Sequence, residues 1–449
     1  MLVLLAGLLV SSCTWFGPQA LDPMKSDPWR HFEIVANGAL TDELVAELET
    51  YGKVVVRLDK IGGVVVKARE SAFPALSAIA GVKAVGRTAE RFAHDCSGGV
   101  STWDLDIINV TDLSGPRVVD YDGTGVYVAV LDTGLVKNWR DYLPEGQVAV
   151  EYAKAFNSGA SPNSNVADVP NLWERDTHSH GTHVTSTILG YNLYGTPISG
   201  AATLATVIPV KVLGNNGGGW SPGIAEGIVY IADLKETLGV PMVINMSLGG
   251  PVLSGIEQAA IDYAIEKGVV IVASAGNEGT AGMGYPGAYA PVVSVGSAGW
   301  IGEWSSGGWW TANVPDPTTA DIVYVSDFSS RELAGQDLDV LAPGSWIVGP
   351  YLAFGAAHPP IWANGKPGEY YYLGGTSMAA PHVAGVVALM LEKNPTLDAS
   401  EVEILLEANA LTIPPGSADV AGVTYTWGAD ATGAGLVLAD DVLLGTPFP

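Results

Sequence analysis

The sequence predicts an α/β protein: a three-layer α/β/α sandwich around a mainly parallel sheet, preceded by a small ferredoxin-like α+β domain. Two patterns support this expectation. After residue 125, short apolar runs rich in β-branched residues alternate with longer helical segments, which is typical of a parallel sheet. Between residues 30 and 92, the order is strand, helix, two strands, helix and strand. The chain has 449 residues, of which 48% are hydrophobic, enough for two or three domains.

The small domain is predicted from six short elements. Thr41 precedes an amphipathic segment whose apolar face carries Leu44 and Leu48, so we expect it to be the N-cap of a helix. A tight turn around Gly62 joins two β-branched runs and indicates a hairpin. Many small α+β domains share this order, so the pattern alone leaves the role of the domain open. The expected strands are 31–37, 53–58, 63–68 and 82–87, and a second helix is expected at 71–80.

The large domain is predicted from strands that are apolar along their whole length. Residues 126–131 are one such run, the composition of a parallel strand that is buried on both faces. Active sites of such sheets form at the carboxyl ends of the strands. Polar residues that follow strands are therefore site candidates, namely Asp132, Ser247 and Asn277. Further strands are expected at 206–213, 242–246, 269–273 and 292–297, with helices at 182–189, 224–237 and 256–267.

Ser377 is the candidate nucleophile. It lies in a Gly-Gly-Thr-Ser segment, followed by small and apolar residues at 383–391 that predict a buried helix. A hydroxyl at the positive end of a helix is well placed to attack a carbonyl group. A serine at such a place is by itself usually only a helix cap.

Two further segments favour catalysis over capping. Asp132 ends an apolar run in the sequence Val-Leu-Asp-Thr-Gly, and His180 directly precedes Gly-Thr-His. Asp, His and Ser in this order is one of the chain orders in which the same catalytic triad has arisen. On these motifs the chain resembles the subtilisin-like serine proteases, the subtilase or peptidase S8 family. The resemblance extends over about residues 103–440, and residues 433–437 resemble the final strand of the family domain.

The resemblance implies a role for each of these groups. His180 would be the general base for Ser377, and Asp132 would orient His180 and stabilise its protonated ring. Asn277 lies in an Ala-Gly-Asn-Glu-Gly segment like the one that supplies the oxyanion-stabilising asparagine of the family. It would act together with the backbone N–H of Ser377. The implied activity is a serine endopeptidase.

The same residues allow other interpretations. His178 and His183 compete with His180 as the base, but the family motif selects the histidine before Gly-Thr-His and leaves His183 a structural role. The three histidines together could suggest a metal, although the His-Glu-x-x-His pattern is absent from the sequence. An α/β-hydrolase would need the serine before its acid and histidine. A catalytically silent relative that only binds peptides in the same cleft is the rival of another class.

Substrate binding is implied by two glycine-containing segments. A peptide would add as a strand between the segment at 247–249 and the segment at 213–217, through backbone hydrogen bonds. Glycines leave the first specificity pocket open to large apolar side chains, and Glu278 at its rim could accept a basic one. Trp220 could narrow a more distant subsite. The residues assigned to substrate binding are Leu213, Gly214, Gly217, Ser247, Leu248, Gly249, Gly276 and Gly284.

The chemistry itself requires no cofactor, but the family often holds structural calcium. Asp141 is the candidate ligand, together with the loop at 192–195. Tyr194 stands in that loop where the family usually has an asparagine oxygen ligand, which departs from the pattern. Ca²⁺ needs six or more oxygens, so the sequence supports this site only through Asp141.

The N-terminus predicts export. Residues 1–13 are mostly apolar and match the hydrophobic region of an export signal, too short to span a bilayer. The segment Val-Ser-Ser-Cys at 10–13 resembles a bacterial lipobox, which would make Cys13 a lipidated membrane tether. No Lys or Arg precedes Cys13, although export signals normally begin with positive charge. Ordinary secretion and a buried apolar segment are the alternatives.

The domain order and the composition add three expectations. The small domain resembles the inhibitor-type propeptide of the family, so we expect a zymogen that is cleaved in the polar segment after it and is inhibited by its own propeptide. A net charge of −26 excludes nucleic acid as a partner. Two cysteines make no disulfide framework, and a monomer is expected. The expected boundaries are signal and lipobox 1–13, linker 14–29, propeptide 30–92, processing linker 93–102 and peptidase 103–445.

Three segments are longer than the family core requires: the loop between the catalytic Asp and His, residues 300–325, and residues 351–372. The last two are rich in aromatic residues, including Trp304, Trp309 and Trp362. We expect surface insertions near the cleft whose aromatic side chains pack on one another, with an extension of the substrate groove as the alternative.

Overall fold

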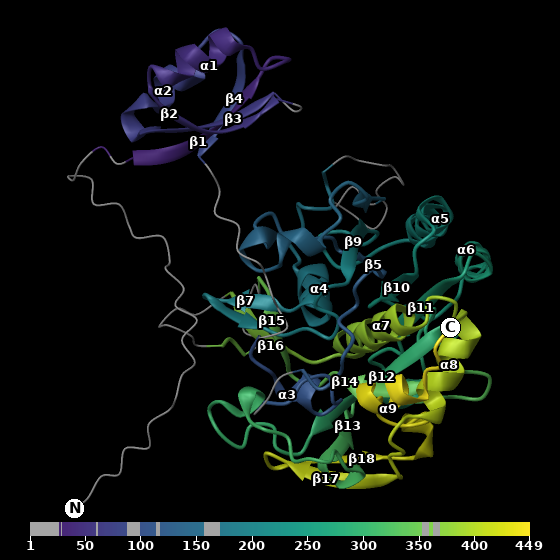
Figure 1. Cartoon of the computed structure of the whole chain (residues 1–449). Coiled ribbons are helices and arrows are strands. Elements are labelled where there is room, and N and C mark those ends of the chain that lie inside the picture. The colour runs from purple at the N-terminus through teal and green to yellow at the C-terminus, as the bar shows by residue number, and fades with distance from the viewer. Residues whose placement is uncertain are drawn as a thin grey trace, which may run out of the picture. The chain divides into compact units, whose positions relative to one another are not determined.

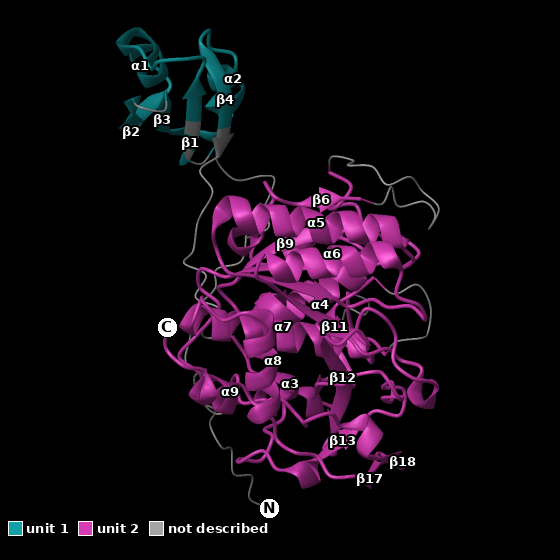
Figure 2. Cartoon of the chain, turned by 90° about the vertical axis from the view of Figure 1, so that its right-hand side faces the viewer, with its two compact units in different colours: residues 1–94 teal, residues 95–449 magenta. Residues whose placement is uncertain are grey.

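The computed structural model describes residue 27 and residues 29–59, 62–87, 99–113, 117–156, 171–352, 359–361 and 369–449. These residues belong to two compact units, 1–94 and 95–449 (Figure 2). The predicted signal segment with Cys13, the second cysteine Cys96, and Trp362 lie outside the described residues. A search of the described helices finds none that is long and apolar enough to cross a membrane.

The small unit has the predicted order of strands and helices. Its antiparallel sheet has the strand order β2-β3-β1-β4, and Thr41 caps α1 by accepting a hydrogen bond from Leu44 N at 3.2 Å. The second helix is shorter than expected, because a 3₁₀ turn at Glu70–Ala72 precedes it. The elements are β1 (Trp29–Ala36), α1 (Asp42–Glu49), β2 (Gly52–Leu58), β3 (Gly63–Arg69), α2 (Phe73–Ser77) and β4 (Val82–Arg87).

The large unit is built on a mainly parallel sheet. Its strand order is β13-β12-β11-β10-β5-β9-β6, with β14 parallel to β12 and only β13 antiparallel to its neighbour. All five predicted strands are present; the strand at 242–246 has the predicted ends, and the ends of the others are shifted by at most three residues. The strands are β5 (Tyr127–Asp132), β6 (Lys154–Ala155), β9 (Thr206–Lys211), β10 (Met242–Met246), β11 (Val269–Ser274), β12 (Val293–Trp300), β13 (Val323–Val325) and β14 (Val340–Pro343).

Helices cover both faces of this sheet (Figure 1). Successive residues of a strand point to opposite faces, so Val243 of β10 packs in the core with α4, α7 and α8, whereas Ile244 packs in the core with α5 and α6. The sheet is therefore buried on both sides, and the predicted three-layer sandwich is confirmed. The helices are α4 (His180–Leu189), α5 (Ser221–Leu238), α6 (Gly255–Glu266), α7 (Thr376–Lys393) and α8 (Ala399–Ala408).

The end of the chain differs from expectation. The predicted strand at 433–437 is wrong: Leu436 forms only single bridges, with Leu341 and Leu411, and a helix follows it. Gly435 has a φ of +134°, which interrupts an extended strand there. The remaining elements are α3 (Trp103–Asp106), the hairpins β7 (Tyr191–Leu193) with β8 (Thr196–Ile198), β15 (Ile347–Pro350) with β16 (Tyr370–Leu373) and β17 (Gly416–Val420) with β18 (Val423–Trp427), and α9 (Ala439–Gly445).

Residues 99–102, assigned to the processing linker, are folded onto the large unit. Val100 N donates to the Pro197 carbonyl at 2.9 Å, and Val100 forms a parallel bridge with Ile198. Ser101 and Thr102 are buried. The folded large unit therefore begins before the predicted boundary at residue 103.

The aromatic segment at 300–325 packs on itself and on β16, as expected. Trp304 lies 5.3 Å from Trp309 and 4.9 Å from Tyr372 between ring centroids. The description as a surface insertion is wrong for much of it, because Trp300, Trp309 and Trp310 are buried in the main core. Burial of these rings offsets the entropy lost in ordering a long loop.

Candidate active site

Asp132 and His180 form a direct pair. Asp132 is the last residue of β5 and fully buried, and His180 is the first residue of α4. His180 Nδ1 lies 2.9 Å from both carboxylate oxygens of Asp132. A carboxylate on Nδ1 requires the proton on that nitrogen, which leaves Nε2 as the basic atom.

The environment of His180 strengthens it as a base. Burial by itself lowers the pKa of His180, but the charge and hydrogen bond of Asp132, together with the charge of Asp176, outweigh it, and the pKa is raised above its ordinary value. A raised pKa means that the ring accepts a proton more readily. His183 lies further along α4 and directs Nε2 to the Ile347 carbonyl at 3.2 Å, a structural contact.

A second polar group behind the pair was not predicted from the sequence. Asp176 accepts hydrogen bonds from Thr133 Oγ1 at 2.7 Å and from the backbone N–H groups of His178 and Ser179. Thr133 Oγ1 in turn accepts from Gly181 N at 2.9 Å. These contacts tie the turn after β5 to the first turn of α4. They therefore fix the spacing between Asp132 and His180.

A buried lysine completes this group. Lys211, the last residue of β9, is 1% exposed and donates from Nζ to the Thr133 carbonyl at 2.5 Å. Its Nζ also lies 3.9 Å from Asp176 Oδ1. Burial lowers the pKa of Lys211 and raises the pKa of Asp176, and the charge of each partner opposes the shift of the other. A lysine at the end of an otherwise apolar strand was the signal in the sequence that could have identified it.

Ser377 lies in the first turn of α7, and a proline four residues later shapes its surroundings. Pro381 is inside α7 and has no N–H, so it cannot donate to the carbonyl of residue 377, four residues earlier. That carbonyl instead accepts from Ser247 Oγ at 2.8 Å. Asn245 Nδ2 donates to the same hydroxyl at 3.0 Å. The helix that carries Ser377 is thereby tied to the loop after β10.

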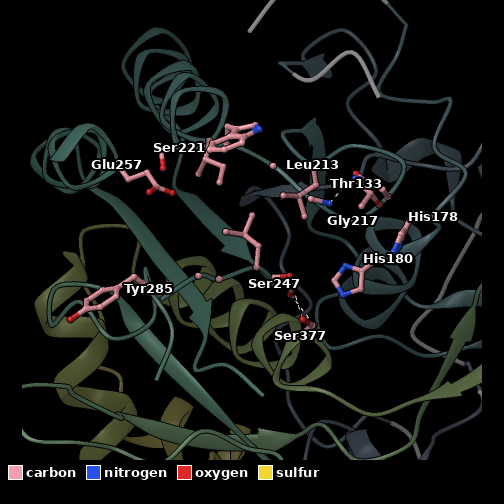
Figure 3. A pocket seen from close by; sticks show the side chains of 18 of the residues that line it. Thr133, His178, His180, Leu213, Gly217, Ser221, Ser247, Glu257, Tyr285 and Ser377 are labelled. Carbon is pink, nitrogen blue, oxygen red and sulfur yellow. Dashed lines mark hydrogen bonds between the residues drawn. The ribbon is translucent and has the colours of Figure 1, made fainter. Parts of the chain in front are cut away.

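Ser377 and His180 line the same pocket (Figure 3). The hydroxyl of Ser377 donates to the Ser247 carbonyl at 3.3 Å in this structure rather than to His180 Nε2. Hydrogen bonds of catalytic groups are often long or differently directed before substrate binds. The arrangement brings a hydroxyl and a base activated by a carboxylate to one wall of a cleft.

Asn277 follows β11 and is oriented by its oxygen. Asn277 Oδ1 accepts from Thr376 N at 2.9 Å and from Thr376 Oγ1 at 3.0 Å. The hydrogen bonds found among the described residues make no use of its Nδ2, which remains able to donate to a ligand. Thr376 directly precedes Ser377, so the amide is fixed beside the N-terminus of α7.

The pocket is a cavity of about 550 Å³ between the segments at 213–220 and 247–252. Its lining includes five of the predicted substrate-binding residues and also His178, Glu257 and Tyr285, which had no assigned substrate role. Trp220 lines it as well and is 51% exposed. The predicted residues on the wall are Leu213, Gly217, Ser247, Leu248 and Gly249.

Gly214, Gly276 and Gly284 lie off this wall. Gly214 N donates to the Gly218 carbonyl at 2.8 Å, so it forms the turn that supports the glycine segment. A Cβ at Gly284 would lie 4.0 Å from the Cα of Gly249, and a Cβ at Gly276 would lie 3.1 Å from Gly284 N. Gly249, Gly276 and Gly284 thus lie close together, at a place where larger residues would add side chains.

The predicted calcium ligand fits poorly. Asp141 lies beside the loop at 192–195, because its carbonyl accepts from Asn192 Nδ2 at 3.4 Å. The loop offers few oxygens, since Asn192 Oδ1 accepts from Gly195 N at 2.7 Å and Tyr194 packs against Tyr370.

Another acidic group fits a cation better. Carboxylate oxygens of Asp337, Asp339 and Glu403 lie within 4.8 Å of one another. Asp339 is 1% exposed, and its Oδ2 accepts from Ser294, whereas its buried Oδ1 has no hydrogen-bond partner. Burial, with a smaller contribution from Glu403, raises the pKa of Asp339 to about 8 despite the Ser294 hydrogen bonds.

Comparison with known proteins places the chain in a family. Residues 123–434 match the model of the subtilase family, peptidase S8. Subtilisin DY of Bacillus licheniformis is 33% identical over 297 residues, 65% of this chain and 86% of that protein. Thermitase of Thermoactinomyces vulgaris is 32% identical over 299 residues, 66% of this chain and 86% of that protein.

Solved structures give the same result. Sphericase matches with a TM-score of 0.55 and 29% identity, over 76% of this chain and 99% of the other. Fervidolysin from Fervidobacterium pennivorans, described as a keratinolytic enzyme related to subtilisin, matches with a TM-score of 0.55 and 27% identity, over 94% of this chain and 62% of the other. The chain belongs to the subtilase family and is a subtilisin-like serine endopeptidase.

Proposed function

We propose that Asp132, His180 and Ser377 form the catalytic triad of this protease, with Asn277 as the side-chain donor to the oxyanion. The observation that carries the assignment is the position of His180 Nδ1, 2.9 Å from both carboxylate oxygens of Asp132. Ser377, which lines the same pocket as His180, provides the nucleophile.

The reaction follows from these positions. His180 Nε2 takes the proton of Ser377 as its Oγ bonds to the scissile carbonyl carbon, and the carbonyl oxygen becomes negative. Asn277 Nδ2 and the N–H of Ser377 donate to that oxygen. His180 then gives its proton to the leaving amine, and the same groups activate a water molecule that hydrolyses the acyl-enzyme.

A peptide substrate would bind as an added strand. The segments at 213–217 and 247–249 line the cavity on either side, and backbone groups there could pair with an extended peptide. Gly249, Gly276 and Gly284 lie close together and add no side chains there, although the Glu278 carboxylate lies beside Gly276. A large apolar side chain next to the scissile bond is expected to bind at this place. Broad cleavage of unfolded proteins is the expected outcome.

We infer that the small unit is an inhibitory propeptide and that the protein is made as a zymogen. Its ferredoxin-like strand order and its position before the protease support this role. The fervidolysin match adds support, because 94% of the chain is more than the large unit alone comprises. Residues 99–102 are folded onto the large unit, so the maturation bond should lie before residue 99.

Export and lipidation rest on the sequence at 1–13. The apolar run and the lipobox-like ending at Cys13 support a tethered protein of the cell envelope. Mass spectrometry of the N-terminal peptide from the native host tests this directly. An acylated Cys13 supports the tether, and an unmodified Cys13 refutes it.

We propose that structural calcium binds at Asp337, Asp339 and Glu403 rather than at Asp141. The pKa of Asp339 is raised, so its contribution to stability is lost as pH rises from about 4 through about 8. A cation that binds the ionised carboxylates should restore stability most above pH 8. Thermal unfolding at pH 6 and 9, with CaCl₂ or a chelator, should show this dependence in wild type and lose it in Asp339→Asn. An identical calcium effect in Asp339→Asn would refute the site.

The triad is tested with wild-type and Ser377→Ala protein expressed without residues 1–13. Wild type should shorten itself by about 75–85 residues, the segment from residue 14 to a bond between β4 and residue 99, and digest casein, whereas the variant should stay full length and inert. If both stay inert, a fluorophosphonate probe separates two causes. Labelling of Ser377 would indicate blocked maturation, and no labelling of correctly folded protein would support the silent, peptide-binding alternative.

A further inference from the structure

One charged side chain in the pocket has no part in the mechanism. Glu257 lies in the first turn of α6 and lines the same cavity as Ser377. Figure 3 shows it beside Ser221, on the opposite side of the cavity from Ser377. It is 8% exposed. A buried carboxylate in a substrate cleft requires an explanation, because desolvation of a charge is costly.

Helix capping accounts for only part of this position. In α8, Asp398 and Glu401 form a complete capping box, in which Glu401 accepts from the backbone N–H of Asp398 at 3.0 Å. In α6 only half of the box is formed: Ser254 Oγ accepts from Glu257 N, and Glu257 Oε2 accepts from the Ser254 hydroxyl at 3.0 Å. The carboxylate of Glu257 is thus held by one hydroxyl.

The charge of Glu257 lacks a cationic partner within the described part of the chain. The ion pairs found there do not include Glu257. It is also the one Asp or Glu among the described residues that line the cavity. Glu257 lies in the first turn of α6, the end of a helix at which the dipole is positive and acidic side chains are common. The cavity therefore presents a fixed negative charge to its contents.

The surrounding side chains suit a long cationic group. Trp220 precedes α5 and is 51% exposed, and Val252 is 74% exposed. Both line the cavity together with Ile224 and Leu248. Apolar walls can cover the methylene stem of Arg or Lys, and an indole face attracts its charged end. A carboxylate within such walls can then pair with the cation.

We propose that Glu257, with Trp220, selects substrates that carry Arg or Lys at one position away from the scissile bond. The proposal rests on the proposed function, because it treats the cavity as the substrate cleft. The net charge of −26 would assist by attracting basic segments of unfolded proteins. The enzyme should therefore favour basic proteins without requiring a basic residue next to the cleaved bond.

The test uses N-acetylated, internally quenched peptides in which each position is varied in turn. Wild type should prefer Arg over its neutral isostere citrulline by about 10- to 100-fold in kcat/KM at one position not adjacent to the bond. Glu257→Gln should reduce that ratio to near one, and Glu257→Lys should favour Glu there instead. Glu401→Gln, the same change at the same place in a helix outside the cavity, should leave the ratio intact.

The outcomes separate this inference from the proposed function. A wild-type enzyme that cleaves the peptides with equal rates for Arg and citrulline at every position away from the bond overturns the inference and leaves the triad intact. An Arg preference that survives Glu257→Gln also overturns it. If that variant fails to fold, the wild-type preference should still shrink with added salt, and a preference unchanged by salt would contradict the proposal. Failure of wild type to cleave any peptide would instead contradict the proposed function.

Discussion

The two ends of the cleft are built differently. At the catalytic end, Asp132 and Lys211 are almost completely buried, and their charged groups are held by His180 and by the Thr133 carbonyl. At the distal end, Glu257 is held by one hydroxyl, and Trp220 is half exposed. The catalytic end therefore depends on exact geometry, whereas the distal end depends on which side chains stand there. Substitutions at the catalytic end should therefore lower kcat or the free energy of unfolding. Substitutions at the distal end should change which substrate side chains the enzyme prefers.

The largest effect is expected for Asp132→Asn. Loss of the carboxylate charge leaves His180 without its partner on Nδ1, and kcat should fall by about 10⁴-fold, as for the triad acid in other serine proteases. Steady-state kinetics on a fluorogenic peptide measures this. Asp321→Asn, an exposed position in the same unit, is the control. Comparable losses in both variants would show that the effect is not specific to the triad.

Removal of the oxyanion donor should come next. Asn277→Leu should lower kcat by about 10²–10³-fold with little change in KM, because the donor acts on charge that develops only in the transition state. Thr376→Val keeps the amide of Asn277 and the hydrogen bond from the N–H of residue 376 to its oxygen, but it removes the hydrogen bond from Thr376 Oγ1, so it should cost clearly less. Equal kcat for wild type and Asn277→Leu would remove Asn277 from the mechanism.

The buried ion pair behind the triad should matter for folding. Lys211→Met leaves Asp176 buried without its cation, and the free energy of unfolding should fall by about 3–5 kcal/mol. Lys267→Met breaks the exposed pair with Glu236. This substitution should change the free energy of unfolding little, because solvent screens that pair. Urea denaturation of the Ser377→Ala background, which cannot digest itself, compares the two. Similar losses would mean that burial of the pair is unimportant.

The pH dependence of activity reports on the catalytic end. His180 must be neutral to accept a proton, and its pKa is raised chiefly because the interactions with Asp132 outweigh the opposing effect of burial. The acid limb of kcat/KM should therefore have its midpoint above the ordinary histidine value, with activity falling about tenfold per pH unit below it. A midpoint below the ordinary value would contradict the influence of Asp132.

The smallest effect is expected for Trp220 at the distal end. Trp220→Ala should reduce the preference for Arg over citrulline about two- to fivefold, the range for a cation over an exposed indole ring. Competition between the two peptides, followed by mass spectrometry, resolves so small a change. A ratio that does not change would leave Glu257 as the sole source of the preference.

The layered fold and the position of the reactive groups could be predicted from the sequence. Buried parallel strands can be recognised in the sequence as apolar runs. Asp132 and Asn277 follow two such strands, and the carboxyl ends of parallel strands lie at one edge of the sheet. The segment at 433–437 was mistaken for a strand because its apolar pattern says nothing about the positive φ of Gly435.

The groups that the sequence did not reveal act through contacts between distant segments. Lys211 and Asp176 are 35 positions apart, and neither lies in a motif whose chemistry is known in advance. In the sequence, Glu257 is an acidic residue in the first turn of a helix, which is common. Only the folded structure shows that it lines the cavity. The role of Pro381 depends on Ser247 being near enough to donate to the released carbonyl. Such roles belong to tertiary packing, which no local pattern encodes.

The most direct test of the account is covalent labelling of the nucleophile. Wild-type enzyme and the His180→Ala variant, which lacks the base, are each treated with a fluorophosphonate and digested for peptide mass spectrometry. The account predicts that the label is found on Ser377 in wild type and is lost or strongly slowed in His180→Ala. Labelling of another residue, or equal labelling of Ser377 in both proteins, would contradict the assignment of His180 and Ser377 to one catalytic unit.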